Sequence, residues 1–165
     1  GPRGSGAIVG RGAHAPRLII VSDFAGPAER QRGKVFGAAE AELIGNLVKR
    51  GFKITDRDVY STLAVKCPLG PGLRPNPSEV KACGQHLTAE LELLATDGLA
   101  GILALGPIAA AALGFEGAHN ATLLLKVGAR ELPVVATDHP RDMLADPARK
   151  APAWKAMQAL LPRLA

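Results

Sequence analysis

The sequence has few cysteines and no long hydrophobic run. Its 165 residues include only Cys67 and Cys83, too few for the disulfide framework of a small secreted domain. Because we also find no secretory leader, we expect a reducing, cytoplasmic setting. No apolar run approaches the roughly 20 residues with which a helix spans a bilayer. The sequence therefore excludes a disulfide-rich scaffold and predicts no contact with a membrane.

The composition is typical of a folded domain rather than a disordered chain. Hydrophobic residues make up 47% and charged residues only 21%, which is enough to bury a core. The formal net charge of +5 makes DNA or another polyanion a natural partner. We find no phosphate loop, dinucleotide fingerprint or internal repeat. We expect a flexible arm over residues 1–16, which are rich in glycine, alanine and arginine, and a single domain over residues 17–165.

Short apolar runs alternate with helical patterns along the chain. Four runs bounded by turn residues predict buried strands: Leu18–Val21, Val59–Val65, Gly101–Leu105 and Leu132–Ala136. Apolar residues at helical spacing predict helices between them and at the end of the chain. This order predicts an α/β fold, a three-layer α/β/α sandwich with a mainly parallel four-stranded central sheet.

Two segments far apart in the sequence are candidates for one functional site. Residues 18–36 pass from an apolar run into a loop rich in glycine and proline, and His139 follows the apolar run 132–136. Loops after the carboxyl ends of parallel strands form the ligand crevice of such sheets. We therefore expect the two segments to converge, with Phe36 and His139 facing each other across one slot.

The motifs in these segments resemble those of the uracil-DNA glycosylase superfamily, in particular its iron–sulfur family 4 branch. Residues 22–26, SDFAG, fill the place of the family's GEAPG loop, and residues 33–36, GKVF, that of its GxPF segment. Residues 65–67, VKC, and the pair His139-Pro140 match two further motifs in order and spacing. The resemblance covers about residues 17–164.

The resemblance implies a site that binds DNA and excises a flipped base. It assigns base stacking to Phe36 and assigns to His139 the hydrogen bond to the departing base. Asp23 retains the carboxylate of the first motif. Gly26 allows the backbone to approach the base closely. The remaining expected contacts are with the DNA backbone, and they come from Pro140, Arg141 and Lys66.

Several polar groups of the family are replaced. Leu63 stands at the base-binding position that usually holds an asparagine, and Ser22 and Ala25 replace a glycine and a proline. A leucine neither donates nor accepts a hydrogen bond, so base readout is impaired. We therefore predict a uracil-DNA glycosylase-like protein whose base excision is weakened or altered. The alternative is a non-catalytic adaptor that reuses the fold for contacts with a protein partner in a replication or repair assembly.

The resemblance also raises the question of an iron–sulfur cluster. The family holds its cluster with four cysteines, and Cys67 and Cys83 stand at two of those positions. Either the other pair lies upstream of Gly1 or the cluster has been lost. We expect no cofactor and no metal, and we expect both cysteines to be buried as small apolar residues.

Overall fold

A six-stranded mixed sheet forms the centre of the molecule. The computed structural model describes residues 6–67 and 73–165. The strands lie in the order β1-β3-β2-β4-β6-β5, and the four inner strands run parallel. These are β2 (Leu18–Phe24), β3 (Val59–Val65), β4 (Gly101–Leu105) and β6 (Arg130–Thr137). The predicted α/β fold and the four predicted strands are thus confirmed, with β2 and β6 longer than expected.

The sheet has two further strands that the sequence analysis did not predict. β1 (Arg11–Gly12) pairs antiparallel with β3, and β5 (Ala121–Val127) pairs antiparallel with β6. Four strands was therefore too few. β1 and the buried Ile8 lie within the segment expected to be a flexible arm, so its residues 8–12 pack on the domain, while residues 1–5 lie outside the described part. In β5, three consecutive leucines obscure the alternation, although Leu124 points to solvent and is 57% exposed.

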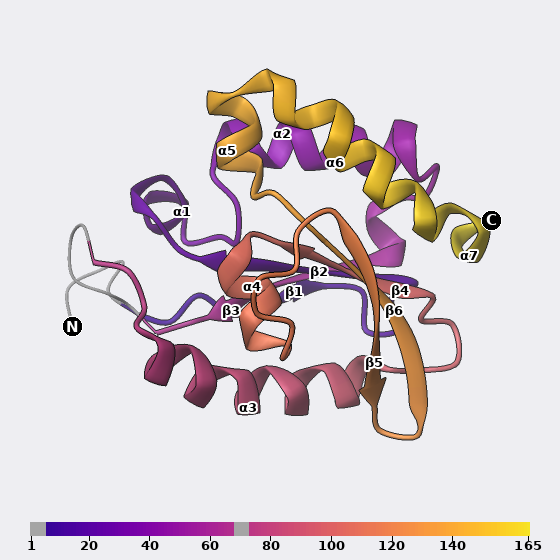
Figure 1. The fold of residues 1–165 in the computed structure, drawn as a ribbon, viewed down its shortest axis with the longest axis horizontal. Coiled ribbons are helices and arrows are strands. Elements are labelled where there is room, and N and C mark those ends of the chain that lie inside the picture. The colour runs from indigo at the N-terminus through magenta and orange to yellow at the C-terminus, as the bar shows by residue number, and fades with distance from the viewer. Residues whose placement is uncertain (1–5, 68–72) are drawn as a thin grey trace.

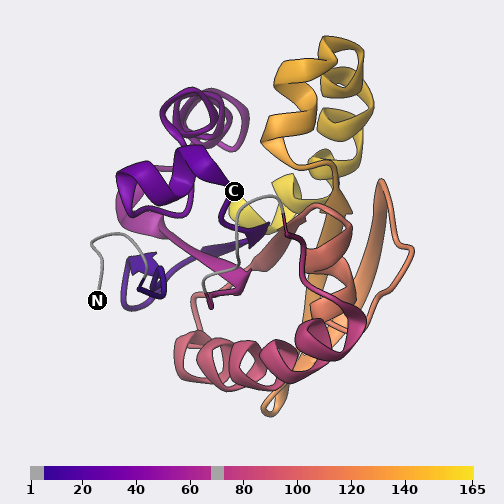
Figure 2. The ribbon, with the colours of Figure 1, turned by 90° about the vertical axis from the view of Figure 1, so that its left-hand side faces the viewer.

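Helices cover both faces of the sheet, which gives the predicted three layers (Figures 1 and 2). On one face lie α3 (Pro77–Leu94) and α4 (Pro107–Ala112). The helices on the other side of the sheet, or at its edge, are α1 (Pro27–Arg32), α2 (Ala38–Asn46), α5 (Pro140–Ala145), α6 (Lys150–Met157) and α7 (Leu161–Leu164). Short helical turns complete the chain: η1 (Leu47–Gly51), η2 (Asp56–Asp58), η3 (Pro147–Arg149) and η4 (Gln158–Leu160). None of the helices in the described ranges combines the length and apolar character that a membrane crossing demands.

The two faces of β2 bury different sets of side chains. Leu18 and Ile20 join the cluster under α2 and α6, whereas Ile19 and Val21 join the cluster under α3 and α4. Successive side chains of a strand point to opposite faces, so a central strand covered on both sides must be apolar throughout. This explains why β2 is an unbroken apolar run until Ser22.

The strand order brings the two candidate segments to one edge of the sheet. β4 pairs with β2 on one side and with β6 on the other, all three parallel. The carboxyl end of β2 carries Ser22 and Asp23, and the chain after β6 carries His139. The loops that follow these strands therefore meet where the ligand crevice of a parallel sheet forms.

Candidate functional site

His139 and Asp23 meet at the carboxyl edge of the sheet. The imidazole Nε2 lies 3.3 Å from the Asp23 Oδ1, and both side chains are buried, at 1% and 3% exposure. Their alignment does not make a hydrogen bond, so the Nε2 of His139 has no partner in the described residues. Asp23 Oδ1 accepts instead from the backbone amide of Phe24 at 2.6 Å. The pair is close enough to act on one small group placed between α1, α5 and the strand ends.

The local fold fixes the tautomer of His139. His139 caps the amino end of α5, and its Nδ1 accepts a hydrogen bond from the backbone amide of Arg141 at 2.9 Å. A neutral imidazole that accepts at one nitrogen carries its proton on the other. Nε2–H is therefore a donor that points into the site. His139 caps the helix and also presents this donor.

Burial lowers the pKa of His139 and raises the pKa of Asp23. Burial, followed by the charge of Arg141, lowers the pKa of His139 to about 3, so the imidazole is neutral at physiological pH. Burial raises the pKa of Asp23 to about 6, opposed by the Phe24 amide and the Arg141 charge. Asp23 is thus ionised near neutral pH but takes up a proton in mildly acidic solution. One group is a neutral donor and the other a carboxylate base.

Arg141 joins three acidic side chains around this pair. Its Nη2 lies 2.7 Å from Glu29 Oε1 and 3.8 Å from Asp23 Oδ1, and its Nε lies 3.9 Å from Glu40 Oε1. Glu29 is 1% exposed, whereas the Arg141 side chain is 40% exposed. Burial, and then the charge of Glu29, raise the pKa of Glu40 to about 6. Arg141 thus pairs most closely with Glu29, supplies one positive charge to a cluster of three acidic side chains, and is not a free surface cation.

The same cluster is the place where a metal ion could be considered. Ligand atoms of Glu29, Glu40 and His139 lie within 4.8 Å of one another. The guanidinium of Arg141 already supplies a positive charge at hydrogen-bond distance from Glu29. The guanidinium and a bound metal ion would compete for the Glu29 carboxylate. One of the three candidate ligands is therefore already engaged in an ion pair.

Two glycines allow close contacts within the site. A Cβ at Gly106 would lie 3.1 Å from Asp23 Oδ2, and Gly106 has a φ of +103°. A Cβ at Gly26 would lie 3.4 Å from a Glu29 oxygen and 3.6 Å from Arg141 Nη2. Gly26 thus lies beside Glu29 and Arg141, and its expected contact with a base stays a prediction. Gly106 follows the end of β4, and because it has no side chain, the Asp23 carboxylate fits next to it.

The segment before His139 is held by a second polar network. Asp138 Oδ1 lies 3.0 Å from Arg149 Nη1 and 3.0 Å from His119 Nε2. Thr137 donates to Asn120 at 2.6 Å. These contacts fasten the end of β6 to η3 and to the chain before β5. The position of His139 is therefore fixed by the chain before it, through the contacts of Thr137 and Asp138, and by the chain after it, through the Arg141 amide.

The base-binding candidates lie in the core next to the site. Leu63 is fully buried, and Phe36 is 7% exposed in the same cluster, which also contains Ile44 and Met143. Phe36 borders a hollow of about 300 Å³ with Arg32 and Lys34, which His139 does not line. Because Phe36 and His139 are both buried, the expected slot between them is not open in this structure.

The DNA-binding candidates lie in different surroundings. Pro140 is buried at the first position of α5, directly beside His139 and Arg141. Lys66 lies 2.7 Å from Glu90 on α3 and donates to the carbonyl of Leu63. Glu90 also accepts from Tyr60 and Thr62. The structure therefore groups Asp23, Gly26, Pro140 and Arg141 with His139, and it places Lys66 in a network on the α3 face.

Three residues near the site did not emerge from the sequence analysis. Glu40 lies at the third position of α2 and accepts from the Gly37 amide at 3.2 Å, a capping pattern readable in the sequence as a glutamate three residues after a cap. The guanidinium groups of Arg74 and Arg141 make cation–π contacts with Phe24, at 5.4 and 5.6 Å from the centre of its ring. No local signal brings Arg74 to Phe24, because that contact arises from the tertiary fold.

The two cysteines do not by themselves fit a four-thiolate cluster. Cys67 is exposed and Cys83 half-buried on α3, which differs from the expected burial of both. Burial and the neighbouring Cys67 thiol raise the pKa of Cys83. Two thiolates make half of the usual ligand set of a cubane cluster. An iron–sulfur cluster bound by four thiolates would need two further cysteines from outside this sequence.

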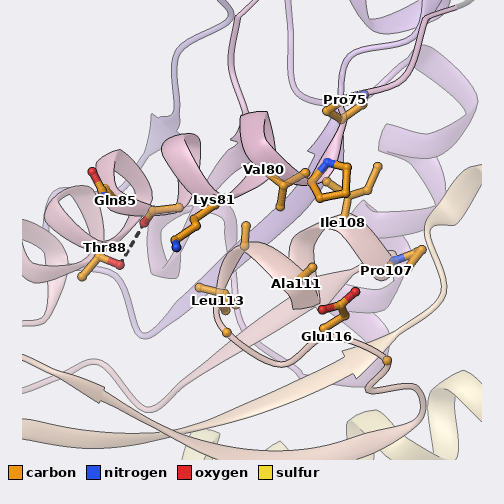
Figure 3. Close-up of a pocket in the computed structure, with 15 residues that line it drawn as sticks. Pro75, Val80, Lys81, Gln85, Thr88, Pro107, Ile108, Ala111, Leu113 and Glu116 are labelled. Carbon is orange, nitrogen blue, oxygen red and sulfur yellow. Dashed lines mark hydrogen bonds between the residues drawn. The ribbon is translucent and has the colours of Figure 1, made fainter.

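A larger cavity lies away from this site. It measures about 790 Å³ and is lined by α3, α4 and the chain after α4, including Val80, Ile108 and Glu116 (Figure 3). Neither His139 nor Asp23 lines it. The cavity lies on the α3 side of the molecule. It is therefore separate from the buried His139–Asp23 pair.

Comparisons with known proteins agree with the motifs. The family model described as the uracil DNA glycosylase superfamily matches residues 9–161. A type-4 uracil-DNA glycosylase of Thermotoga maritima is 31% identical over 90 residues, which cover 54% of this chain and 46% of the relative. The enzyme of the same description from Pyrobaculum aerophilum is 32% identical over 107 residues, which cover 65% of this chain and 53% of the relative. The chain thus spans about half the length of the curated relatives it matches.

Proposed function

Because the chain belongs to the uracil-DNA glycosylase superfamily, we propose that it is a DNA glycosylase that hydrolyses the N-glycosidic bond of a flipped, deaminated base. The observation that supports this proposal most strongly is the buried pair of His139 and Asp23, with a free Nε2–H. The type-4 uracil-DNA glycosylases among its relatives make uracil in DNA the first substrate to test.

The proposed role of His139 follows from its tautomer. When the C1′–N1 bond of deoxyuridine breaks, the electron pair leaves with N1, and the negative charge spreads to the O2 of the base. The neutral Nε2–H of His139 donates a hydrogen bond to that oxygen as the charge develops. A preorganised donor in an enclosed site of low dielectric constant stabilises such an anion more than bulk water does. The pKa of about 3 keeps the imidazole neutral throughout.

The proposed role of Asp23 follows from its charge. The sugar left behind carries positive charge at C1′, which a nearby carboxylate stabilises. A water molecule then forms the new C1′–O bond, and the Asp23 carboxylate accepts its proton. The side chain is one methylene shorter than the glutamate of the family loop, and it is drawn toward the Phe24 amide. We therefore propose that excision is slower than in a protein with the longer carboxylate.

The entry of a base requires a rearrangement. His139, Leu63 and Phe36 are all buried, and the side chain of Arg141 spans from α5 to Glu29 on α1. The phosphates of DNA offer Arg141 an alternative anionic partner at this edge. We propose that DNA binding draws Arg141 away from Glu29 and moves Phe36 to stack on the flipped base.

An excision assay tests the proposal. Single-stranded and double-stranded oligonucleotides carrying uracil, hypoxanthine or xanthine are incubated with the protein and with His139→Ala, and base release is measured. Release by the parent protein that falls by a hundredfold or more in the variant is the expected result, in the range found when one preorganised donor is removed. The absence of release from every substrate would exclude a glycosylase.

The second candidate is a non-catalytic adaptor, and one observation favours it. The pocket is closed by the buried Leu63 and Phe36, and Glu29 beside it is paired with Arg141. A closed pocket bordered by an ion pair is what a domain kept only for its fold would retain. Stable capture of a partner protein together with no base release from any of the three lesions would support the adaptor.

A further inference from the structure

Ser22 has an unexplained hydroxyl at the same edge of the sheet. Among the described residues, two buried side-chain polar atoms have no hydrogen-bond partner, and they are Ser22 Oγ and His139 Nε2. Ser22 is fully buried. A buried polar atom without a partner is unfavourable by about 1–3 kcal/mol, so natural proteins keep few of them. Both atoms lie at the carboxyl ends of parallel strands, where a ligand binds.

The register of the sheet places this hydroxyl beside the substituted base-binding position. Ser22 on β2 is the pairing partner of Leu63 on β3. Side chains of paired residues lie on the same face of a sheet, at about 5 Å from one another. Leu63 belongs to the cluster that contains Phe36. Ser22 therefore lies on the face where the base would stack, next to the residue that can form no hydrogen bond.

We infer that Ser22 is a specificity-determining residue whose hydroxyl hydrogen-bonds the polar edge of the flipped base. This inference rests on the proposed function, because it requires that a base enters the site. Leu63 then supplies an apolar contact, and Ser22 supplies the hydrogen bond that Leu63 cannot form. A hydroxyl can donate to a keto oxygen or accept from a ring N–H. The class of ligand is therefore a nucleobase that carries a keto group on this edge.

A role of Ser22 in base binding can be distinguished from a structural role by the effect of removing its hydroxyl on stability. A serine that stabilises the fold loses stability when its hydroxyl is removed. Here the hydroxyl has no partner within residues 6–67 and 73–165, so its removal relieves a cost and weakens only the complex with the base. Activity and stability should therefore change in opposite directions, or stability should stay the same.

The test compares Ser22→Ala with Ser78→Ala, which removes an exposed serine hydroxyl from α3 on the other side of the sheet. For each variant we measure uracil release, the melting temperature, and binding to an oligonucleotide that carries a non-hydrolysable 2′-fluoro-deoxyuridine or an abasic analogue. We expect Ser22→Ala to lose about tenfold in release and in preference for the base over the abasic analogue, roughly the effect of one hydrogen bond. Its melting temperature should not fall, and Ser78→Ala should match the parent protein.

Each result has a definite meaning. A lower melting temperature of Ser22→Ala, or an unchanged preference for the base, overturns the inference. If Ser22→Ala does not fold, Ser22→Gly serves in the same measurements. If the parent protein releases no base but prefers the uracil analogue in a Ser22-dependent way, the inference stands and the glycosylase proposal fails. If it shows no such preference, the inference fails with or without release.

Discussion

The Nε2 of His139 lies 3.3 Å from the Oδ1 of Asp23, and both side chains are buried where β2 ends and where the chain leaves β6. The proximity depends on β4, which holds β2 and β6 on its two sides. Because His139 also caps α5 through Nδ1, the imidazole cannot rotate without losing that hydrogen bond. A neutral donor and a buried carboxylate are thus fixed relative to one another before any ligand binds.

The activity should fall in mildly acidic solution because of Asp23. The pKa of Asp23 is raised to about 6, so the carboxylate that accepts the proton of water is lost as the pH falls through 6. His139 stays neutral, since its pKa is about 3 and lies below this range. Uracil release measured from pH 4.5 to 8 should therefore show one acid limb with a midpoint near pH 6.

Two variants identify the group whose protonation lowers uracil release in acid. Asp23→Asn should give slow release that does not vary with pH across this range. Glu40→Gln removes the other carboxyl group whose pKa is raised to about 6, and it should keep the limb. A limb that persists in Asp23→Asn would assign the titration to another group.

Replacement of Arg141 should destabilise the protein through Glu29. Arg141→Ala leaves the Glu29 carboxylate buried, at 1% exposure, without its cation. Loss of one partner of a fully buried ion pair costs about 3–5 kcal/mol, and the partial exposure of Arg141 reduces this to roughly 2 kcal/mol. Urea denaturation measures the difference in the free energy of unfolding.

The matched control for Arg141 is Arg57, which is exposed on η2. Arg57→Ala should change the free energy of unfolding by less than about 0.5 kcal/mol. Adding Glu29→Gln to Arg141→Ala should restore part of the stability, because a neutral amide costs less to bury than a carboxylate. Equal stability of Arg141→Ala and the parent protein would show that Glu29 is not held by this ion pair.

A side chain at Gly106 should damage both the backbone and the site. Gly106→Ala puts a Cβ at a φ of +103° and 3.1 Å from Asp23 Oδ2. The strained backbone alone costs about 1–3 kcal/mol, and Asp23 must shift to make room. We expect lower stability, measured by thermal unfolding, together with reduced uracil release. Gly98→Ala is the control, because its Cβ meets nothing within 4 Å. Normal uracil release by Gly106→Ala would show that the position of Asp23 is not critical.

An asparagine at position 63 should improve base recognition at the expense of stability. Leu63 is fully buried in an apolar cluster, so Leu63→Asn leaves an amide without partners in the free protein, at a cost of about 1–3 kcal/mol. In the complex, the amide can pair with the edge of the base. We expect a lower melting temperature and a stronger preference for uracil over an abasic analogue in DNA binding. A variant that unfolds more easily without any gain in that preference would place Leu63 outside the base contact.

Much of the fold was predictable because strong local patterns coincide with the layers. The four inner strands are short apolar runs bounded by turn residues, and helical patterns separate them. β1 was missed because two residues carry no periodicity, and β5 because its exposed Leu124 interrupts the pattern of an edge strand. Pairing of these edge strands depends on partners elsewhere in the chain.

The candidate site was predictable in part. The segments that hold Asp23, Gly26 and His139 could be placed together because loops after parallel strands converge at one edge, whereas the roles expected of these residues came from the family resemblance. The pairing of Lys66 with Glu90 and the closure of the site around Phe36 were not evident, because both depend on how helices pack on the sheet. Ser22 was visible as a substitution, but the lack of a partner for its hydroxyl is known only from the atoms around it.

The sequence by itself determined the layered α/β fold, the motifs that resemble those of the family and the apolar Leu63 where that resemblance implies an asparagine, since these depend on residue type and spacing along the chain. The tertiary structure alone decided that Arg141 pairs with Glu29, that His139 presents Nε2–H, and that the Ser22 hydroxyl lies beside Leu63 without a partner among the described residues. These three facts arise from contacts between segments far apart in the sequence, where packing and burial set the charge and hydrogen bonding of each group.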